Sequence, residues 1–231
     1  MKTFLPTSPS PLRTLVALVA TLTLAVRAPA ETRWHEHSMH LYLGQVNSAA
    51  TIYGRGNYGK LDLGSDAERG IGYTVQLKDD LDLEFALGQV HSSGTQHGRT
   101  GSGDEADRLY VDLQLTSLYI TGKQRYEPLA GLFVPWVGAG LNADLLETEE
   151  TETVMASGGS ITKPRTMRSS SAVGVHGVAG IDMYPRKTSA VALSVQFRYD
   201  LTLLERGPFD GEIGGFGLLF GLRWDFFADT L

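Results

Sequence analysis

Residues 216–226, FGLLFGLRWDF, alternate between large apolar side chains and small or charged ones. In an extended strand, one face would carry Phe216, Leu218, Phe220, Leu222, Trp224 and Phe226, and the other Gly217, Leu219, Gly221, Arg223 and Asp225. A strict period of two predicts a β-strand that buries or exposes one apolar face. We therefore expect a strand here, with its aromatic face against an apolar environment.

The same alternation recurs along the chain. It is clear in residues 81–88, 109–116 and 191–200, and in the second of these the apolar set is Leu109, Val111, Leu113 and Leu115. Weaker stretches cover residues 37–46, 70–78, 131–142 and 172–184, where β-branched and aromatic residues are interleaved with glycine. A helix would not tolerate glycine at this density. The pattern predicts an all-β fold of about eight antiparallel strands.

The connections between these strands alternate in length. Residues 47–69, 91–106, 143–171 and 201–212 are long and polar, whereas Asp79-Asp80 and residues 185–189 are short, and residues 120–129 are intermediate. Transmembrane up-and-down barrels have long extracellular loops on one rim and tight periplasmic turns on the other. The loop lengths therefore favour a membrane barrel with both termini in the periplasm.

The N-terminus has the features of a secretory signal peptide. Lys2 and Arg13 precede an apolar run at residues 15–26, and Ala28-Pro29-Ala30 supplies small residues for a cleavage site. The apolar run is shorter than the ~20 residues that a spanning helix needs, which argues against an uncleaved anchor. We expect a signal peptide at residues 1–30 and a barrel domain at 31–231. Cleavage would remove three basic residues and no acid, which changes the net charge from -6 to -9.

The polar faces of the predicted strands distinguish a membrane barrel from a soluble secreted barrel of the lipocalin kind. A soluble barrel would carry many Lys and Glu residues on its outer surface. These faces are mostly Gly, Ala, Ser, Thr and Gln, which suit a crowded interior. Aromatic residues near the strand ends are typical of the belts at the two membrane interfaces. For these belts we predict Tyr42, Tyr73, Trp136, Tyr199, Trp224 and Phe226.

If the polar faces point inward, their charges must pair, because an unpaired buried charge is costly. From the strand directions, Arg223 and Asp225 should lie level with Asp82 and Glu84 near the periplasmic end. Arg198 and Asp200 should lie near the outer end, within reach of Asp112. We predict an interior charge network of Asp82, Glu84, Asp112, Arg198, Asp200, Arg223 and Asp225.

Composition excludes several function classes. The chain has no cysteine, so disulfides, thiolate metal sites and cysteine nucleophiles are absent. No run of Lys or Arg occurs, and the net charge is -6, which argues against nucleic-acid binding. We expect no cofactor.

Three short patterns offer chemistry, and each has an ordinary explanation. Residues 54–59, GRGNYG, match a dinucleotide-binding fingerprint, but no helix pattern follows them, so a surface loop is expected. His35, His37 and His40 could hold a transition metal, but they lie near a chain end and no fourth ligand is evident. His91 and Ser93 would share a strand face at the outer rim, but no enzyme motif surrounds them. We predict no catalytic, cofactor or metal site.

The segment 143–171 carries acids before Gly158-Gly159 and bases after it. A fold at these glycines would place Glu152 opposite Arg165 and Glu149 opposite Arg168, so the strands could continue above the membrane as a charge-paired hairpin. A polar loop is the alternative. Such exposed pairs would select register more than they stabilise.

Residues 135–140, PWVGAG, resemble a strand motif of the small outer-membrane β-barrel superfamily, the porin-like group that includes OmpA/OmpX-type barrels. Residues 179–182, AGID, and 195–200, VQFRYD, resemble the next two strands of that family. The resemblance spans about residues 38–227 and implies architecture and location. One departure is the C-terminus: Phe226-Phe227 is followed by four further residues, whereas the family usually ends in an aromatic residue that the assembly machinery recognises.

Together these features predict an integral protein of the bacterial outer membrane with a structural or surface-interaction role. The alternatives are a narrow pore or small-solute conduit, a lipid-modifying enzyme, and a soluble lipocalin-like barrel. An eight-stranded barrel is just wide enough for side chains to fill it, which disfavours a large pore. The expected partners are outer-membrane lipid and lipopolysaccharide, the barrel-assembly machinery, and an extracellular partner bound through the loops. We expect a monomer.

Overall fold

The computed structural model describes residues 37–48, 51–53, 60–62, 65–78, 80–97, 108–156, 159–162, 166–204 and 211–226. The predicted signal peptide, the 54–59 glycine motif and His35 lie outside these residues. Within them, no helix is long and apolar enough to cross a membrane.

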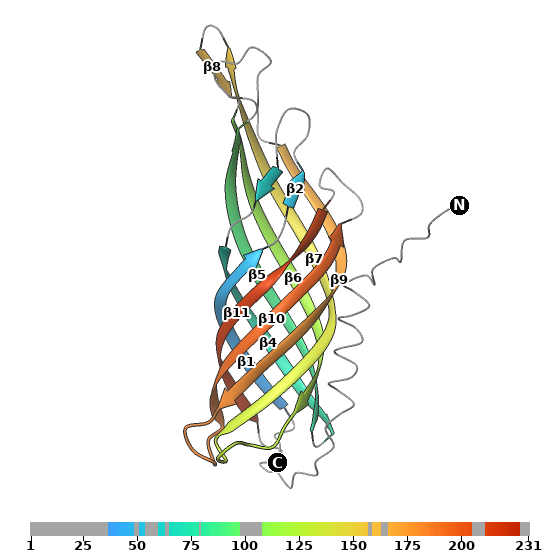
Figure 1. Cartoon of the computed structure of the whole chain (residues 1–231), viewed down its shortest axis with the longest axis vertical. Helices are drawn as coiled ribbons and strands as arrows, with labels where there is room; N and C mark the ends of the chain where they lie inside the picture. The colour runs from blue at the N-terminus through green and yellow to red at the C-terminus, as the bar shows by residue number, and fades with distance from the viewer. Residues whose placement is uncertain are drawn as a thin grey trace, which may run out of the picture.

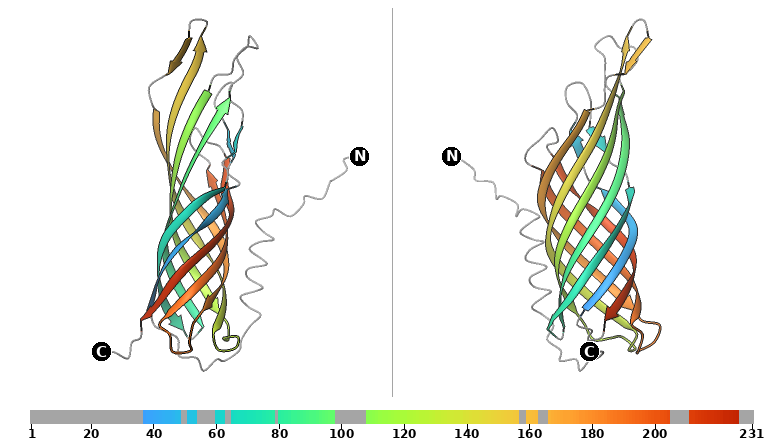
Figure 2. Two further views of the ribbon diagram at one scale, coloured as in Figure 1. Left: turned by 90° about the vertical axis from the view of Figure 1, so that its left-hand side faces the viewer. Right: turned by 180° about the vertical axis from the view of Figure 1, so that it is seen from behind.

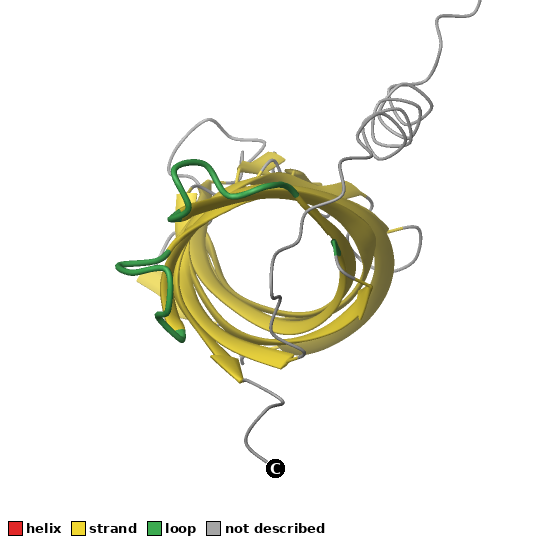
Figure 3. Ribbon diagram, turned by 90° about the horizontal axis from the view of Figure 1, so that it is seen from below, coloured by secondary structure: helices red, strands yellow, loops and turns green. Residues whose placement is uncertain are grey.

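Eight antiparallel strands form a closed ring (Figures 1 and 3). They are β1 (His37–Ser48), β4 (Ser65–Lys78), β5 (Leu81–His97), β6 (Arg108–Arg125), β7 (Phe133–Ala156), β9 (Thr166–Met183), β10 (Val191–Leu204) and β11 (Gly211–Phe226). The first strand pairs with the last, His37 opposite Phe226, and the β6–β7 pairing completes the ring. The short strands β2 (Thr51–Tyr53) and β3 (Lys60–Asp62) form a separate antiparallel pair, and β8 (Gly159–Thr162) pairs antiparallel with the end of β7. The predicted eight-stranded barrel is confirmed.

The outer surface of the ring is apolar over part of its height, and we call this part the apolar band. Outward side chains there include Leu43, which is 68% exposed, and Phe220, which is 50% exposed. The wider set is Met39, Leu41, Ile71, Phe85, Leu87, Leu118, Ile120, Leu141, Leu193, Phe197, Phe216 and Leu222. A water-soluble protein does not expose so large a continuous apolar area. This surface matches the lipid-facing band of a transmembrane barrel and overturns the soluble lipocalin-like alternative.

Four neighbouring strands, β5, β6, β7 and β9, continue well beyond the others at the end opposite the His37–Phe226 pair (Figure 2). In this extension the alternation is inverted. Val111 and Leu113 are 2% and 4% exposed and face the interior, while Asp112 and Gln114 face outward. The expectation that Val111 and Leu113 belong to the lipid-facing side was therefore wrong. Outside the bilayer the surrounding solvent is water, so the apolar face turns inward, as in a soluble protein.

The extension occupies much of two predicted loops. Strand β5 runs to His97 into the 91–106 segment, and β7 runs to Ala156 into the 143–171 segment. The β7–β8–β9 region forms the predicted hairpin, but its register differs: Glu149 lies opposite Met167, and Arg168 lies opposite Thr148. The Arg168 guanidinium instead pairs with Glu150, with NH2 and Oε2 3.7 Å apart. Arg165, the expected partner of Glu152, lies outside the described residues.

Candidate functional site

The end of the lumen near His37 and Phe226, which is predicted to face the periplasm, holds a layer of buried ion pairs. Arg125 Nε lies 2.6 Å from Asp82 Oδ2, and Arg223 Nε lies 2.7 Å from Asp225 Oδ1. Arg223 NH1 also reaches Asp182 Oδ2 at 3.4 Å, so the pairs form one network across several strands. All five side chains are buried. The layer therefore fills the barrel with mutually compensated charge.

Tyr184 adds a hydrogen bond to this layer from just beyond the end of β9. Its hydroxyl donates to Asp225 Oδ2 at 2.7 Å. Burial and the nearby carboxylate of Asp225 raise the pKa of the Tyr184 phenol well above its ordinary value. The phenol thus remains a hydrogen-bond donor at physiological pH.

A second layer is centred on Glu84. Its Oε2 lies 2.5 Å from Lys123 Nζ and 3.2 Å from His40 Nδ1, and it accepts a hydrogen bond from Thr74 at 3.2 Å. The Lys123 ammonium also sits 4.1 Å from the centre of the Trp136 ring, at cation–π distance. These side chains come from five different strands, so they close the lumen across its width.

A short apolar layer lies between the Glu84 layer and a further charged layer around Arg198. Tyr42, Ala86, Tyr119 and Leu219 form a cluster of buried residues. Above it, Arg198 lies 4.3 Å from the Tyr119 ring centre, pairs with Asp200 Oδ2 at 2.8 Å, and forms an ion pair with Glu68 on the facing strand β4. His176 is held by Thr121, with Nε2 and Oγ1 2.8 Å apart.

The outermost part of the lumen is held by hydrogen bonds among Asn142, Asp144 and Thr202. Asn142 Nδ2 donates to Asp144 Oδ2 at 2.6 Å and to Thr202 Oγ1 at 2.7 Å, although their strands β7 and β10 are separated by β9. Gly174 lies between them in register. A Cβ at Gly174 would come within 2.8 Å of Asn142 Oδ1, so the missing side chain allows this contact.

Of the predicted charge network, the structure places Asp82, Glu84, Arg198, Asp200, Arg223 and Asp225 inside the barrel. Asp112 is a correction: it faces outward from the extension and contacts His91, with Oδ1 and Nε2 3.4 Å apart. The prediction assumed that the polar face of residues 109–116 points inward, which is true only of strand segments within the membrane.

Two of the predicted interface aromatics were wrong. Tyr42 and Trp136 are 7% and 3% exposed and point into the lumen. Each fits because a neighbouring strand carries glycine, Gly70 beside Tyr42 and Gly180 beside Trp136. A Cβ on Gly180 would approach Trp136 Cε2 to 2.7 Å. Proximity to a strand end predicts depth in the membrane but does not decide the face.

The other predicted aromatics, Tyr73, Tyr199, Trp224 and Phe226, are exposed on the outer surface. Tyr73 lies beside His37, with Oη and Nδ1 2.9 Å apart, whereas His40 points into the lumen. Among the described residues, no group of three or more His, Cys, Asp or Glu side chains is placed to coordinate a metal ion.

The sequence analysis did not predict five buried charged groups, Glu68, Lys123, Arg125, Asp144 and Asp182. Each lies on the inward face of its strand. Lys123 and Arg125 follow Tyr119 and Thr121 at intervals of two, in a segment that was predicted to be a connection. Continuing the strand alternation through residue 125 would have found both.

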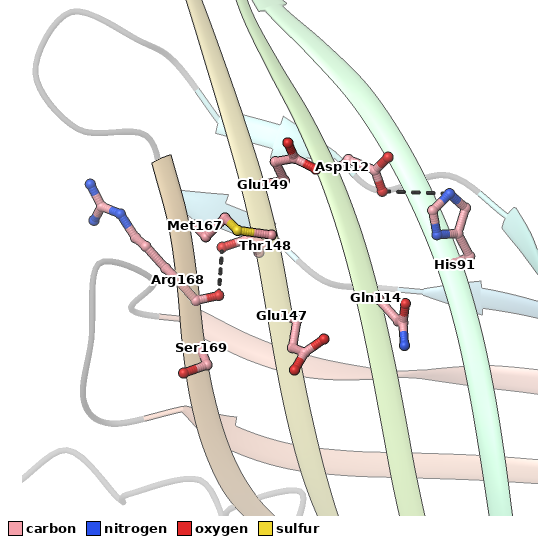
Figure 4. A pocket seen from close by; sticks show the side chains of 9 residues that line it. All are labelled: His91, Asp112, Gln114, Glu147, Thr148, Glu149, Met167, Arg168 and Ser169. Atoms are coloured by element: carbon pink, nitrogen blue, oxygen red, sulfur yellow. Dashed lines mark hydrogen bonds and ion pairs between the residues drawn. The ribbon is translucent and has the colours of Figure 1, made fainter. Parts of the chain in front are cut away.

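A hollow of about 450 Å³ lies on the outer wall of the extension, above the apolar band (Figure 4). Its lining includes His91, Asp112, Gln114, Glu147 and Glu149, from three adjacent strands. In Figure 4 the His91 ring points toward Asp112, and Arg168 points away from both. Ser93 is exposed on the same wall, directly opposite Asp112 in register. The wall is thus polar, mostly acidic and accessible from water.

Two solved structures share this architecture. The outer membrane protein OprG from Pseudomonas aeruginosa matches with a TM-score of 0.56 and 12% identity, over 85% of this chain and 98% of that one. Neisserial surface protein A matches with a TM-score of 0.50 and 14% identity, over 83% of this chain and 97% of the other. No protein-family model matches the sequence, and no curated protein matches it.

At these identities the likeness concerns the fold. Both matched structures share the fold, and the closed ring and the apolar band are features of a transmembrane barrel. This agrees with the predicted location in the bacterial outer membrane. The chain has the fold of the small outer-membrane β-barrel proteins.

Proposed function

We propose that this protein is a closed, non-catalytic barrel of the bacterial outer membrane that acts through its outer surface and not through its lumen. The observation that carries the proposal is the inversion of the strand pattern above the apolar band. There, Asp112, Gln114 and Glu147 face water while Val111, Leu113 and Leu146 form an apolar interior. Strands packed in this way form a rigid wall outside the membrane, suited to a structural or surface-interaction role.

The filled lumen supports the non-conducting part of the proposal. Ion pairs from Arg125, Lys123, Arg198 and Arg223 cross the barrel in successive layers. We expect the purified protein to give no current steps in planar lipid bilayers, because ion passage would require these buried pairs to separate. A sixteen-stranded porin, whose lumen is an aqueous channel, is the positive control. Reproducible steps from the wild-type chain would favour the narrow-pore alternative.

The outer wall also contains the residues of the lipid-modifying alternative. His91 contacts Asp112 at 3.4 Å, and Ser93 lies on the same face, which resembles part of a hydrolase constellation. A nucleophile needs its base within hydrogen-bond reach, and no hydrogen bond joins Ser93 to His91 among the described contacts. We expect a fluorophosphonate probe to leave the folded protein unlabelled. Labelling that Ser93→Ala and His91→Ala abolish, and Ser169→Ala on the same wall does not, would overturn the non-catalytic proposal.

A further inference from the structure

The outward face of the extension is a sheet face above the apolar band, where the surrounding solvent is water. Asp112 lies opposite Glu149 there in register, and Gln114 lies opposite Glu147. These residues line the hollow of about 450 Å³ (Figure 4). Ligand-binding clefts have volumes of roughly 300 to 1,000 Å³, so the hollow can admit side chains of a partner.

The hollow carries two carboxylates whose charge no described Lys or Arg compensates. Glu147 is exposed, and neither it nor Asp112 pairs with a Lys or Arg side chain among the described residues. Of the described residues that line the hollow, Arg168 alone is a Lys or Arg, and its NH2 lies 3.7 Å from Glu150 Oε2. In Figure 4 the Arg168 side chain points away from Asp112. The hollow therefore favours a positively charged partner and disfavours an anionic one.

Exposed apolar side chains adjoin these carboxylates. Met167 is 80% exposed and lies opposite Glu149 in register. Tyr110 is 41% exposed and precedes Asp112 by two residues, on the same face of β6. Water surrounds both side chains, so covering them with apolar groups of a partner would be favourable. Methionine and tyrosine are also enriched where proteins bind one another. This indication of a protein partner is independent of the charge.

A partner that complements both features carries basic side chains together with an apolar one. We propose that the hollow binds a lysine- or arginine-rich segment of a partner protein, with basic side chains against Asp112 and Glu147 and an apolar side chain against Met167. The strands of the wall are paired in register across its width, so the wall loses little conformational freedom on binding. This inference rests on the proposed role of the outer surface and names the class of partner.

A fluorescent lysine-rich peptide that contains a single leucine is the probe. It is titrated with the folded full-length barrel in zwitterionic detergent micelles, and its fluorescence anisotropy measures binding, with empty micelles as the blank. We expect saturable binding that weakens as salt is added, because ions screen exposed charges beyond about 10 Å at roughly 0.1 M ionic strength. Absence of saturable binding to the wild-type chain would overturn the proposal.

The carboxylates are tested by removing their charges. Glu147→Gln should weaken peptide binding by about threefold, and Asp112→Asn together with Glu147→Gln by about tenfold, the scale of one and two exposed ion pairs. Glu127→Gln is the matched control, because it removes the same charge from an exposed position in the turn between β6 and β7, at the opposite end of the barrel. It should bind like the wild type. The mobility of unheated samples in gels confirms that each variant is folded. Equal binding by the double variant and the wild type would contradict the proposal.

Met167→Ser tests the apolar contact. It should weaken binding of the leucine peptide by about threefold, and it should leave binding of the same peptide with serine in place of leucine unchanged. No effect on either peptide would mean that the hollow recognises charge alone. Equally strong displacement by a small polyamine would mean that the ligand is an amine. Each of these two results would refute a protein segment as the partner.

The two proposals fail separately. Current steps or fluorophosphonate labelling would refute the closed, non-catalytic barrel whether or not the peptide binds. A lack of peptide binding without steps or labelling would refute only the class of partner.

Discussion

Replacing Arg198 with methionine is expected to lower the free energy of unfolding by about 3 to 5 kcal/mol. The guanidinium is 3% exposed, pairs with Glu68 and Asp200, and lies against the Tyr119 ring. Methionine keeps much of the side-chain volume but leaves two carboxylates in the lumen without a counter-charge. Urea unfolding in lipid vesicles, followed by the mobility of unheated samples in gels, measures the change.

Arg69→Met is the control for this prediction. Arg69 is exposed on the outer surface, where its NH2 donates to Gln89 Oε1 at 2.8 Å. Its loss should change stability by no more than about 1 kcal/mol. Equal effects of the two substitutions would mean that the Arg198 pairs do not hold the lumen together.

The substitution Phe220→Arg is expected to destabilise the folded barrel by about 2 to 4 kcal/mol in lipid vesicles. Phe220 is half exposed on β11, and its registered neighbours are Leu43 on β1 and Val195 on β10. In a bilayer an arginine here would lie against acyl chains. The cost arises from moving a charge into hydrocarbon, so it should depend on depth along the strand.

Gln114→Arg is the control, because it places an arginine at an outward position of the extension, outside the apolar band. Gln114 lines the hollow above the apolar band, where water surrounds the wall. Its replacement should cost about 0 to 1 kcal/mol, as at the membrane interface. If the two arginines were equally tolerated, the apolar band would not be the lipid-facing surface.

The C-terminal strand illustrates how much the sequence could predict. Over residues 216–226 every second residue is apolar and faces outward in the structure, and Arg223 and Asp225 face the lumen. Here the alternation, the aromatic content and the final position in the chain all indicate the same orientation. The same consistency held for Asp82, Glu84 and Arg198, which lie on strand segments within the apolar band.

Residues 109–116 show where this reasoning failed. Their alternation is as regular as that of the last strand, yet Val111 and Leu113 point inward and Asp112 points outward. Periodicity states that two faces differ, but it does not state which solvent lies outside the barrel at that height. That height depends on the register between strands, which is set by pairings such as Ser117 with Gly88 and with Asp144.

Glu68 and Asn142 show a second limit. Nothing local marks either as a lumen residue, because each acquires its role from strands distant in the sequence: Glu68 from Arg198, and Asn142 from Thr202 across Gly174. Ring closure and strand stagger determine which residues form a cross-barrel contact.

By itself, the sequence determined that this protein is a barrel of about eight strands with an apolar and a polar face, because strand periodicity and turn spacing are local properties of the chain. Only the tertiary structure decided which face meets lipid, water or the lumen at each height, and which charges meet there. The physical reason is that closing the ring fixes the stagger of the strands, and the stagger sets each side chain's depth and its neighbours across the barrel.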